Sequence, residues 1–245
     1  MLSRRTVLRA GAISAALGMA SPRAARPDAA IVPAYFGPDY FPAEWELLAD
    51  PRIYAVILNV ANGPGDAPNP VFAAAVRRIE ERGGTVAGYV DVGYGRRDPA
   101  LIEADVRRYR SWYHVADIFC DQVPAGPDML PIMQQVSDRL RGADAEFIAF
   151  NHGVYPDPGY GALADLLVTF EGPLASYPAV QPPAWTMTGP RQRFCHLVYG
   201  VAEPEVDAVL TLARRRNTGV VYVTDHTGSN PYGGLPSYFP RLLTL

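Results

Sequence analysis

Short apolar runs alternate with longer amphipathic segments along most of this chain. The runs are rich in valine, isoleucine and leucine, and their length is typical of buried strands. The strands predicted from this pattern are residues 31–36, 54–60, 85–90, 117–121, 146–151, 166–171, 193–199 and 219–225. The helical segments predicted between them are residues 70–82, 98–113, 128–141 and 203–216. Helices after the first, fifth and sixth strands are only weakly marked.

The order of these elements predicts the fold class. Asp98-Pro99 and Glu203-Pro204 are typical helix starts, because proline fits the first helical turn and an acidic residue complements it. Eight successive strand–helix units, with no linker or low-complexity segment between them, favour one α/β domain, a (β/α)8 TIM-type barrel over residues 31–245. A doubly wound open sheet is the alternative.

The first twenty residues have the pattern of an export signal. Arg4 and Arg5 lie in a segment, SRRTVLR, that resembles a twin-arginine motif, and an apolar stretch follows at 10–20. That stretch is too short for a permanent membrane span, and Gly18 and Ala20 suit a signal peptidase. We predict a signal peptide over residues 1–20, a flexible lead-in to about residue 30 and export to the periplasm or the cell exterior. An ordinary secretory signal is the alternative.

The composition is that of an ordinary globular protein with an acidic mature form. Hydrophobic residues make up 49% of the chain and charged residues 19%, enough for a large core. Without the predicted signal, 19 basic residues face 25 acidic ones, a net charge of about −6. An acidic exported protein is a poor candidate for nucleic-acid binding. We expect a neutral or cationic partner, no stable membrane span and a monomer.

Polar or aromatic side chains lie at or near the end of every predicted strand. In a (β/α)8 barrel the active site is built at the C-terminal ends of the strands. The candidates at these ends are Tyr35, Asn59, Tyr89 with Asp91, Asp121, Asn151, Glu171, His196 and Asp225. Residues two apart share a face of a strand, so we expect Thr169 to face inward with Glu171. The same rule places Val223 inward with Asp225.

Two of these strand ends carry carboxylates that can work as a pair. Asp121 ends the fourth strand and Glu171 the sixth, and alternate strands contribute to the same layer of a barrel interior. Paired carboxylates are what glycoside hydrolysis requires: about 5–5.5 Å apart for retention and about 6.5–9.5 Å apart for inversion. We predict Asp121 as nucleophile or transition-state stabiliser, and Glu171 as general acid/base with a pKa raised by apolar surroundings.

The remaining candidates suit sugar binding, although each also has a structural interpretation. We expect aromatic rings to stack on sugar faces and polar groups to bind hydroxyl or amino groups. The aromatic set is Tyr35, Tyr89, Tyr94 and Trp185, and the polar set is Asn59, Asp91, Asn151, His196 and Asp225. Asp225 also fits a cap or turn, and His196 also fits a buried, hydrogen-bonded histidine. Trp185, in a proline-rich stretch, also fits a cover over a hydrophobic patch.

An ordered series of short blocks across the predicted mature chain resembles the spherulin-4 family. The blocks are VPAYF at 32–36, LNVANGPG at 58–65, AGYV at 87–90 with YG at 94–95, RY at 108–109 with WY at 112–113, DIFCD at 117–121, FN at 150–151, VTFEG at 168–172, YVTD at 222–225 and LPSYF at 235–239. The resemblance implies a secreted, TIM-barrel glycoside hydrolase that cleaves galactosamine-containing polysaccharide internally, notably α-1,4-linked N-acetylgalactosamine. It implies no metal or organic cofactor.

The resemblance assigns the family's fourth-strand aspartate to Asp121 and its sixth-strand glutamate to Glu171. The family pattern places a glutamate directly after that aspartate, whereas this chain has Gln122. Gln122 cannot titrate, but its amide can hydrogen-bond a sugar hydroxyl or acetamido group. A non-catalytic carbohydrate-binding barrel is therefore the second functional class, and an exported structural or stress protein without a sugar site is the third.

Two cysteines in an exported chain raise the question of a disulfide. Cys120 precedes Asp121 and Cys195 precedes His196, so with those residues inward both thiols face the helical layer. They lie on the fourth and seventh strands, and a bridge needs Cα atoms within about 7 Å. We predict two buried free thiols. Only four histidines are present, without paired spacing, so we predict no metal site.

Overall fold

The computed structural model describes residues 29–244 and has eight parallel strands in one sheet. The strands are β1 (Ile31–Ala34), β2 (Ala55–Leu58), β3 (Val86–Asp91), β4 (Asp117–Asp121), β5 (Phe147–Asn151), β6 (Leu166–Pro173), β7 (Phe194–Tyr199) and β8 (Val220–Thr224). They are ordered from β1 to β8 as in the sequence. The Val221 N–H donates to the Ala29 carbonyl at 3.1 Å, so β8 returns to the segment before β1. The sheet is a nearly closed barrel, and the predicted (β/α)8 fold is confirmed.

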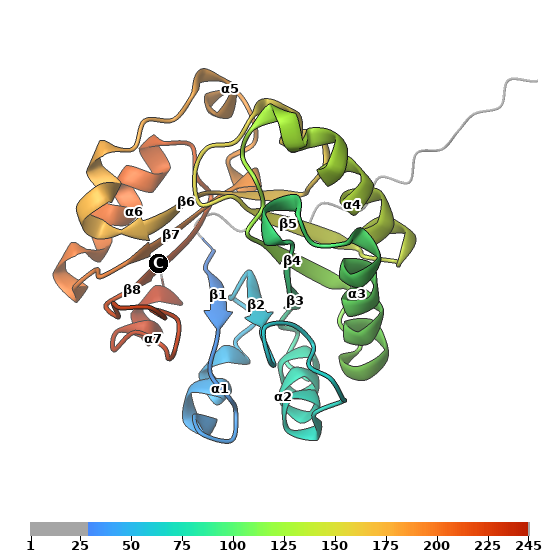
Figure 1. Ribbon diagram of the computed structural model, residues 1–245. Coiled ribbons are helices and arrows are strands. Elements are labelled where there is room, and N and C mark those ends of the chain that lie inside the picture. The colour runs from blue at the N-terminus through green and yellow to red at the C-terminus, as the bar shows by residue number, and fades with distance from the viewer. Residues whose placement is uncertain (1–28, 245) are drawn as a thin grey trace, which may run out of the picture.

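Helices lie around the outside of the strands (Figure 1). They are α1 (Pro42–Leu48), α2 (Pro70–Glu81), α3 (Pro99–Tyr113), α4 (Leu130–Gly142), α5 (Ala184–Met187), α6 (Val206–Arg215) and α7 (Phe239–Leu242). Asp98 caps α3 as predicted, because its side chain accepts a hydrogen bond from Ala100 N. The segments after the fifth and sixth strands, where the sequence marks helices only weakly, contain short elements. A 3-10 turn, Pro158–Ala162, follows β5, and a second, Leu174–Ala179, lies between β6 and α5.

The apolar positions of the strands and helices form one continuous core. Gly88 on β3 shows how closely its layers approach, since a Cβ there would lie 2.6 Å from the Tyr109 ring of α3. Tyr109 is fully buried and donates a hydrogen bond to the Leu58 carbonyl at 2.9 Å. Only glycine therefore allows α3 to lie this close to the sheet.

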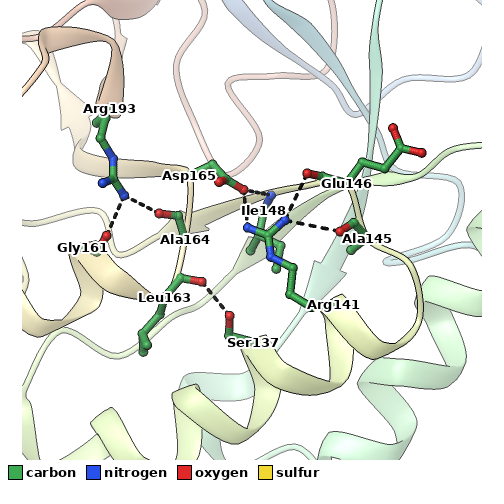
Figure 2. A network of polar contacts seen from close by, with 10 residues as sticks. All are labelled: Ser137, Arg141, Ala145, Glu146, Ile148, Gly161, Leu163, Ala164, Asp165 and Arg193. Carbon is green, nitrogen blue, oxygen red and sulfur yellow. Dashed lines mark hydrogen bonds and ion pairs between the residues drawn. The ribbon is translucent and has the colours of Figure 1, made fainter. Parts of the chain in front are cut away.

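Polar contacts tie α4 to the N-terminal ends of β5 and β6 (Figure 2). Arg141 pairs with the Asp165 carboxylate, which also accepts the Ile148 N–H at 2.8 Å. Arg193 donates to two carbonyl groups just before β6. This network lies at the end of the barrel opposite to the strand ends that carry Asp121 and Glu171. It therefore supports the scaffold and leaves the opposite face to the candidate site.

Part of the predicted organisation lies outside the described residues. The predicted signal peptide, residues 1–20, and most of the predicted lead-in precede residue 29, the first that the structure describes. Within residues 29–244, no helix has both the length and the apolar character needed to cross a bilayer.

Candidate active site

The carboxyl groups of Asp121 and Glu171 converge on one amide at the C-terminal face of the barrel. Asn151, at the end of β5, lies between β4 and β6. Its Nδ2 donates to Asp121 Oδ1 at 2.7 Å and to Glu171 Oε2 at 2.6 Å. Its Oδ1 accepts the Gly153 N–H at 3.1 Å, which sets the orientation of the amide. One side chain therefore joins the two acids that the strand pattern predicts as a pair.

The shared nitrogen limits the separation of the two carboxyl oxygens that it joins. The oxygens that Asn151 joins are no farther apart than the sum of 2.7 and 2.6 Å, about 5.3 Å. This limit suits the about 5–5.5 Å of retaining glycosidases better than the about 6.5–9.5 Å of inverting ones.

A tyrosine hydroxyl donates to the other oxygen of each carboxyl group, the one that Asn151 does not contact. Tyr89 OH donates to Asp121 Oδ2 at 2.8 Å, and Tyr232 OH donates to Glu171 Oε1 at 2.9 Å. The Tyr35 ring lies between the two tyrosines and meets each nearly edge-on, with centroid distances of 5.5 and 5.6 Å. The predicted sugar platforms Tyr35 and Tyr89 thus contact the acid pair or its partners directly.

A β-bulge on β6 directs Glu171 into the barrel. The pairing of β6 with β7 shifts between Val168 and Phe170, which leaves Thr169 as an extra residue. Val168 pairs with Asn151 and shares its inward face, and Glu171 faces inward three positions later. The expected two-residue alternation is wrong here, because it would make Thr169 rather than Val168 the inward neighbour of Glu171.

Burial and a neighbouring carboxylate raise the proton affinity of both acids, with Asp91 acting on Asp121 and Asp121 acting on Glu171. Burial raises the pKa of Asp121 against hydrogen bonds from Tyr89, Gln122 and Asn151 that lower it. Burial also raises the pKa of Glu171, and the Asp121 charge adds to this, against hydrogen bonds from Asn151 and Tyr232. Asp121 has the larger set of donors, so it is the better candidate for the ionised member and Glu171 for the proton carrier.

Gln122 turns from Asp121 toward the neighbouring strand. Its Nε2 donates to Asp91 Oδ2 at 3.1 Å, while Asp91 Oδ1 accepts the Gly93 N–H at 2.7 Å. Gln122 has a φ of 54°, in the left-handed region. Asp91 and Asp121 are register partners on β3 and β4, so Asp91 lies beside the acid pair on the same face.

Asn59 and Tyr94 lie at neighbouring strand ends without touching the acid pair. Asn59 Oδ1 accepts the Gly63 N–H at 3.0 Å and shapes the turn after β2. Tyr94, in the turn after β3, is 52% exposed and lies against Arg96, whose guanidinium is 5.9 Å from the ring centroid. Tyr94 therefore has a half-exposed ring at this end of the barrel, as a sugar platform would.

His196 and Asp225 are not part of this cluster. Glu171 pairs with Leu197, which puts His196 on the outer face of β7, where Tyr177 OH lies 2.8 Å from its Nδ1. Burial, with a smaller effect of Arg216, lowers the His196 pKa to about 3, so the ring is neutral. The predicted inward position of His196 is wrong, and its structural interpretation fits.

The prediction of which β8 side chains face inward is wrong as well. Tyr222, not Val223, pairs with the inward Leu197. Asp225 follows β8 and accepts the Ser237 hydroxyl at 2.6 Å within the loop that follows, as a turn residue does. Trp185 packs on Phe194 at the start of β7, at the opposite end of the strand from the acids, with a centroid distance of 5.6 Å.

Tyr232 is the site residue that the sequence pattern missed. It lies in the loop after β8, is 4% exposed and contacts both Glu171 and Tyr35. The available signal was its position, an aromatic residue in a loop at the C-terminal face. That signal does not single out Tyr232, because its role depends on a partner far away in the sequence.

Both cysteines are free and buried, as predicted, but they face opposite sides of the sheet. Cys120 pairs with Val90 on the outer face of β4. Cys195 pairs with the inward Val168, and burial followed by the Glu171 charge raises its pKa. The predicted outward position of Cys195 is wrong. Among residues 29–244, no group of three or more His, Cys, Asp or Glu side chains is placed to hold a metal ion.

The fold and this acid pair define a glycoside-hydrolase-like (β/α)8 barrel. The profile of spherulation-specific family 4 (Spherulin4) matches residues 29–245, and the chain belongs to this family. The resemblance seen in the sequence blocks is confirmed.

Several solved structures have similar folds, whereas no curated protein matches the chain. Sph3 from Aspergillus clavatus, in complex with GalNAc, has a TM-score of 0.75 at 19% identity, over 92% of this chain and 98% of that protein. A chitinase from Chromobacterium violaceum ATCC 12472 has a TM-score of 0.50 at 11% identity, over 88% of this chain and 98% of that protein. At these identities the similarity concerns the fold.

Proposed function

We propose that this protein is an exported glycosidase that cleaves galactosamine-containing polysaccharide with Asp121 and Glu171. The observation that carries the proposal is the amide of Asn151, which donates to both carboxyl groups and keeps one oxygen of each within about 5.3 Å of the other, a separation that suits retaining chemistry. Family membership supports the same reaction class.

The two acids take different roles in a double displacement. Asp121, ionised, attacks the anomeric carbon, while Glu171 gives its proton to the glycosidic oxygen as the bond between that oxygen and the anomeric carbon breaks. Water then attacks the anomeric carbon, gives a proton to Glu171 and releases Asp121. The raised pKa of Glu171, caused first by burial, suits a group that must hold a proton near neutral pH.

Amino-sugar polymers are the proposed substrate class. The Sph3 structure, which shares the fold, contains GalNAc. Asp91, Asp121 and Glu171 place carboxyl groups along one side of the mouth, from β3 to β6. Such a surface favours chains that carry some free, cationic amino groups as well as acetylated ones.

Release of reducing ends from defined glycans tests this function. Wild-type protein is incubated with α-1,4-linked N-acetylgalactosamine polymer, partly deacetylated polymer and a neutral glycan, beside Asp121→Asn and Glu171→Gln. We expect turnover of the galactosamine polymers by the wild type and a loss of at least about 10³-fold in either variant. His196→Gln is the control, because His196 is a buried β7 residue on the outer face of the sheet, and this variant should retain turnover.

The same experiment separates hydrolysis from binding alone. Saturable glycan binding without turnover, unchanged by Glu171→Gln, would identify a carbohydrate-binding barrel instead. Gln122→Glu restores the family pattern, so turnover that appears only in that variant would assign the loss of activity to Gln122. Neither binding nor turnover with any glycan would contradict the proposed function.

A further inference from the structure

The hydrogen-bond partners of Glu171 differ in a way that decides where its proton can reside. Oε2 accepts from Asn151 Nδ2, an amide nitrogen that can only donate. Oε1 accepts from the Tyr232 hydroxyl, which can donate to a carboxylate and can also accept from a carboxylic acid. A proton on Oε2 would face a donor, whereas a proton on Oε1 faces a group that can turn to accept it.

We propose that Glu171 carries its catalytic proton on Oε1, against the hydroxyl of Tyr232, and that Tyr232 is the positioning residue for proton transfer. This inference rests on the proposed glycosidase function. When the Oε1–H bond breaks, the proton passes to the glycosidic oxygen, that oxygen leaves the anomeric carbon and Asp121 bonds to the carbon. The proton released by the attacking water then returns to Oε1, and the Tyr232 hydroxyl turns back to donate.

The surroundings of Tyr232 hold its hydroxyl in place. Its backbone N–H donates to Asn230 Oδ1 at 3.1 Å, and its carbonyl accepts the Tyr35 N–H at 3.2 Å. The Glu44 carboxylate accepts the Leu235 N–H at 2.7 Å and ties the same loop to α1. The Tyr232 ring is buried and lies edge-on to Tyr35. The hydroxyl can therefore rotate about its own bond while the ring keeps its position.

Among the described residues that face Glu171, Asp121 is the charged one. The titratable side chains that face Glu171 are Asp121 from β4, Tyr89 from β3, Tyr35 after β1, Cys195 from β7 and Tyr232 from the loop after β8. Burial is the first cause that raises the pKa of each tyrosine and of the thiol, so these four are neutral. Asp91 lies beyond Asp121 and acts on it.

Tyr89 provides a matched control, because it makes the same contact with the other acid. Tyr232→Phe and Tyr89→Phe each remove one hydroxyl and keep the ring. In both wild-type contacts the hydroxyl donates to the carboxylate and lowers its pKa. Glu171 must be protonated to act, so Tyr232→Phe should move the alkaline limb of the kcat/KM profile up by about one pH unit and lower kcat more than it raises KM. Asp121 must be ionised, so Tyr89→Phe should move the acid limb up instead.

A carboxyl-carbon NMR titration of the full chain tests the same inference without turnover. The Glu171 signal is identified by its absence in Glu171→Gln, and Tyr232→Phe should raise its titration midpoint while Tyr89→Phe leaves it nearly unchanged. An unchanged midpoint in a folded Tyr232→Phe protein, or the same limb moving in both variants, would overturn the proposal. If no glycan is cleaved, the glycosidase function fails, and this titration still decides the role of Tyr232.

Discussion

Replacing Asn151 by aspartate tests the amide bridge, the pair of hydrogen bonds from the Asn151 nitrogen to Asp121 and Glu171. The change replaces only that nitrogen, by an oxygen. An aspartate keeps the oxygen that accepts the Gly153 N–H but replaces the nitrogen that donates to Asp121 and Glu171. Asn59→Asp is the matched control. Asn59 directly follows β2 and also accepts a backbone N–H, from Gly63, but its amide nitrogen makes no contact with the acid pair.

The size of the effect follows from the two contacts that are lost. A hydrogen bond to a charged group is worth about 1.5–3 kcal/mol and one to a neutral group about 0.5–1.5 kcal/mol, so the contacts with ionised Asp121 and protonated Glu171 together amount to about 2–4.5 kcal/mol. Three carboxyl groups would then share the space, and their pKa values would rise further because the donor that lowers both is gone. For a domain of this size, about 3 kcal/mol lowers the Tm by about 6–12 °C.

The pH dependence of this loss has a definite sign. The folded state of Asn151→Asp binds more protons than the unfolded chain, so its stability falls as pH rises through the raised pKa values of the three acids. Thermal unfolding by calorimetry should show a large deficit at pH 8 and a much smaller one at pH 5, whereas Asn59→Asp stays near the wild type at both. Equal deficits in the two variants, or a deficit for Asn151→Asp that does not shrink at pH 5, would refute the bridge.

Three further predictions concern other parts of the chain. Glu171→Gln should raise the Tm at pH 8 and not at pH 4, because burial raises the Glu171 pKa and makes its charge costly at high pH; a lower Tm at pH 8 contradicts this. We also propose twin-arginine export, so changing Arg4 and Arg5 to lysine should stop export in a host with that pathway, and unchanged export would favour an ordinary secretory signal. Cys120 and Cys195 should resist a thiol reagent until unfolding, since both are buried, and rapid labelling of the folded protein would be inconsistent with this.

The strand pattern was sufficient to predict the barrel and most of the acid cluster. Buried parallel strands need β-branched, apolar runs, and each such run in this chain became a strand. Asp121, Asn151 and Glu171 were found because a barrel brings its strand ends to one face. Their grouping therefore follows from topology, which the order of elements contains.

The rule that residues two apart share a face of a strand failed where the register with the neighbouring strand decides which side chains point inward. Thr169 is an extra residue only in relation to β7, so nothing in the β6 sequence alone marks it. His196 was expected inward because a polar residue at a strand end suggested a site, yet Leu197 is the register partner of Glu171. Tyr232 was missed for a related reason, since its partners are Tyr35, just after β1, and Glu171 on β6.

The contact between Tyr35 and Tyr232 determines when during folding the site can form. Tyr35 follows the first strand and Tyr232 the last, and their backbone hydrogen bond joins residues near the two ends of the described chain. Contacts of such long sequence separation bear a large loop-closure entropy and tend to form late. Synthesis must therefore reach the last strand before Glu171 has its complete set of partners. A ribosome-bound or C-terminally truncated chain would contain both acids and still lack a working site, so catalytic activity would report that the whole barrel has assembled.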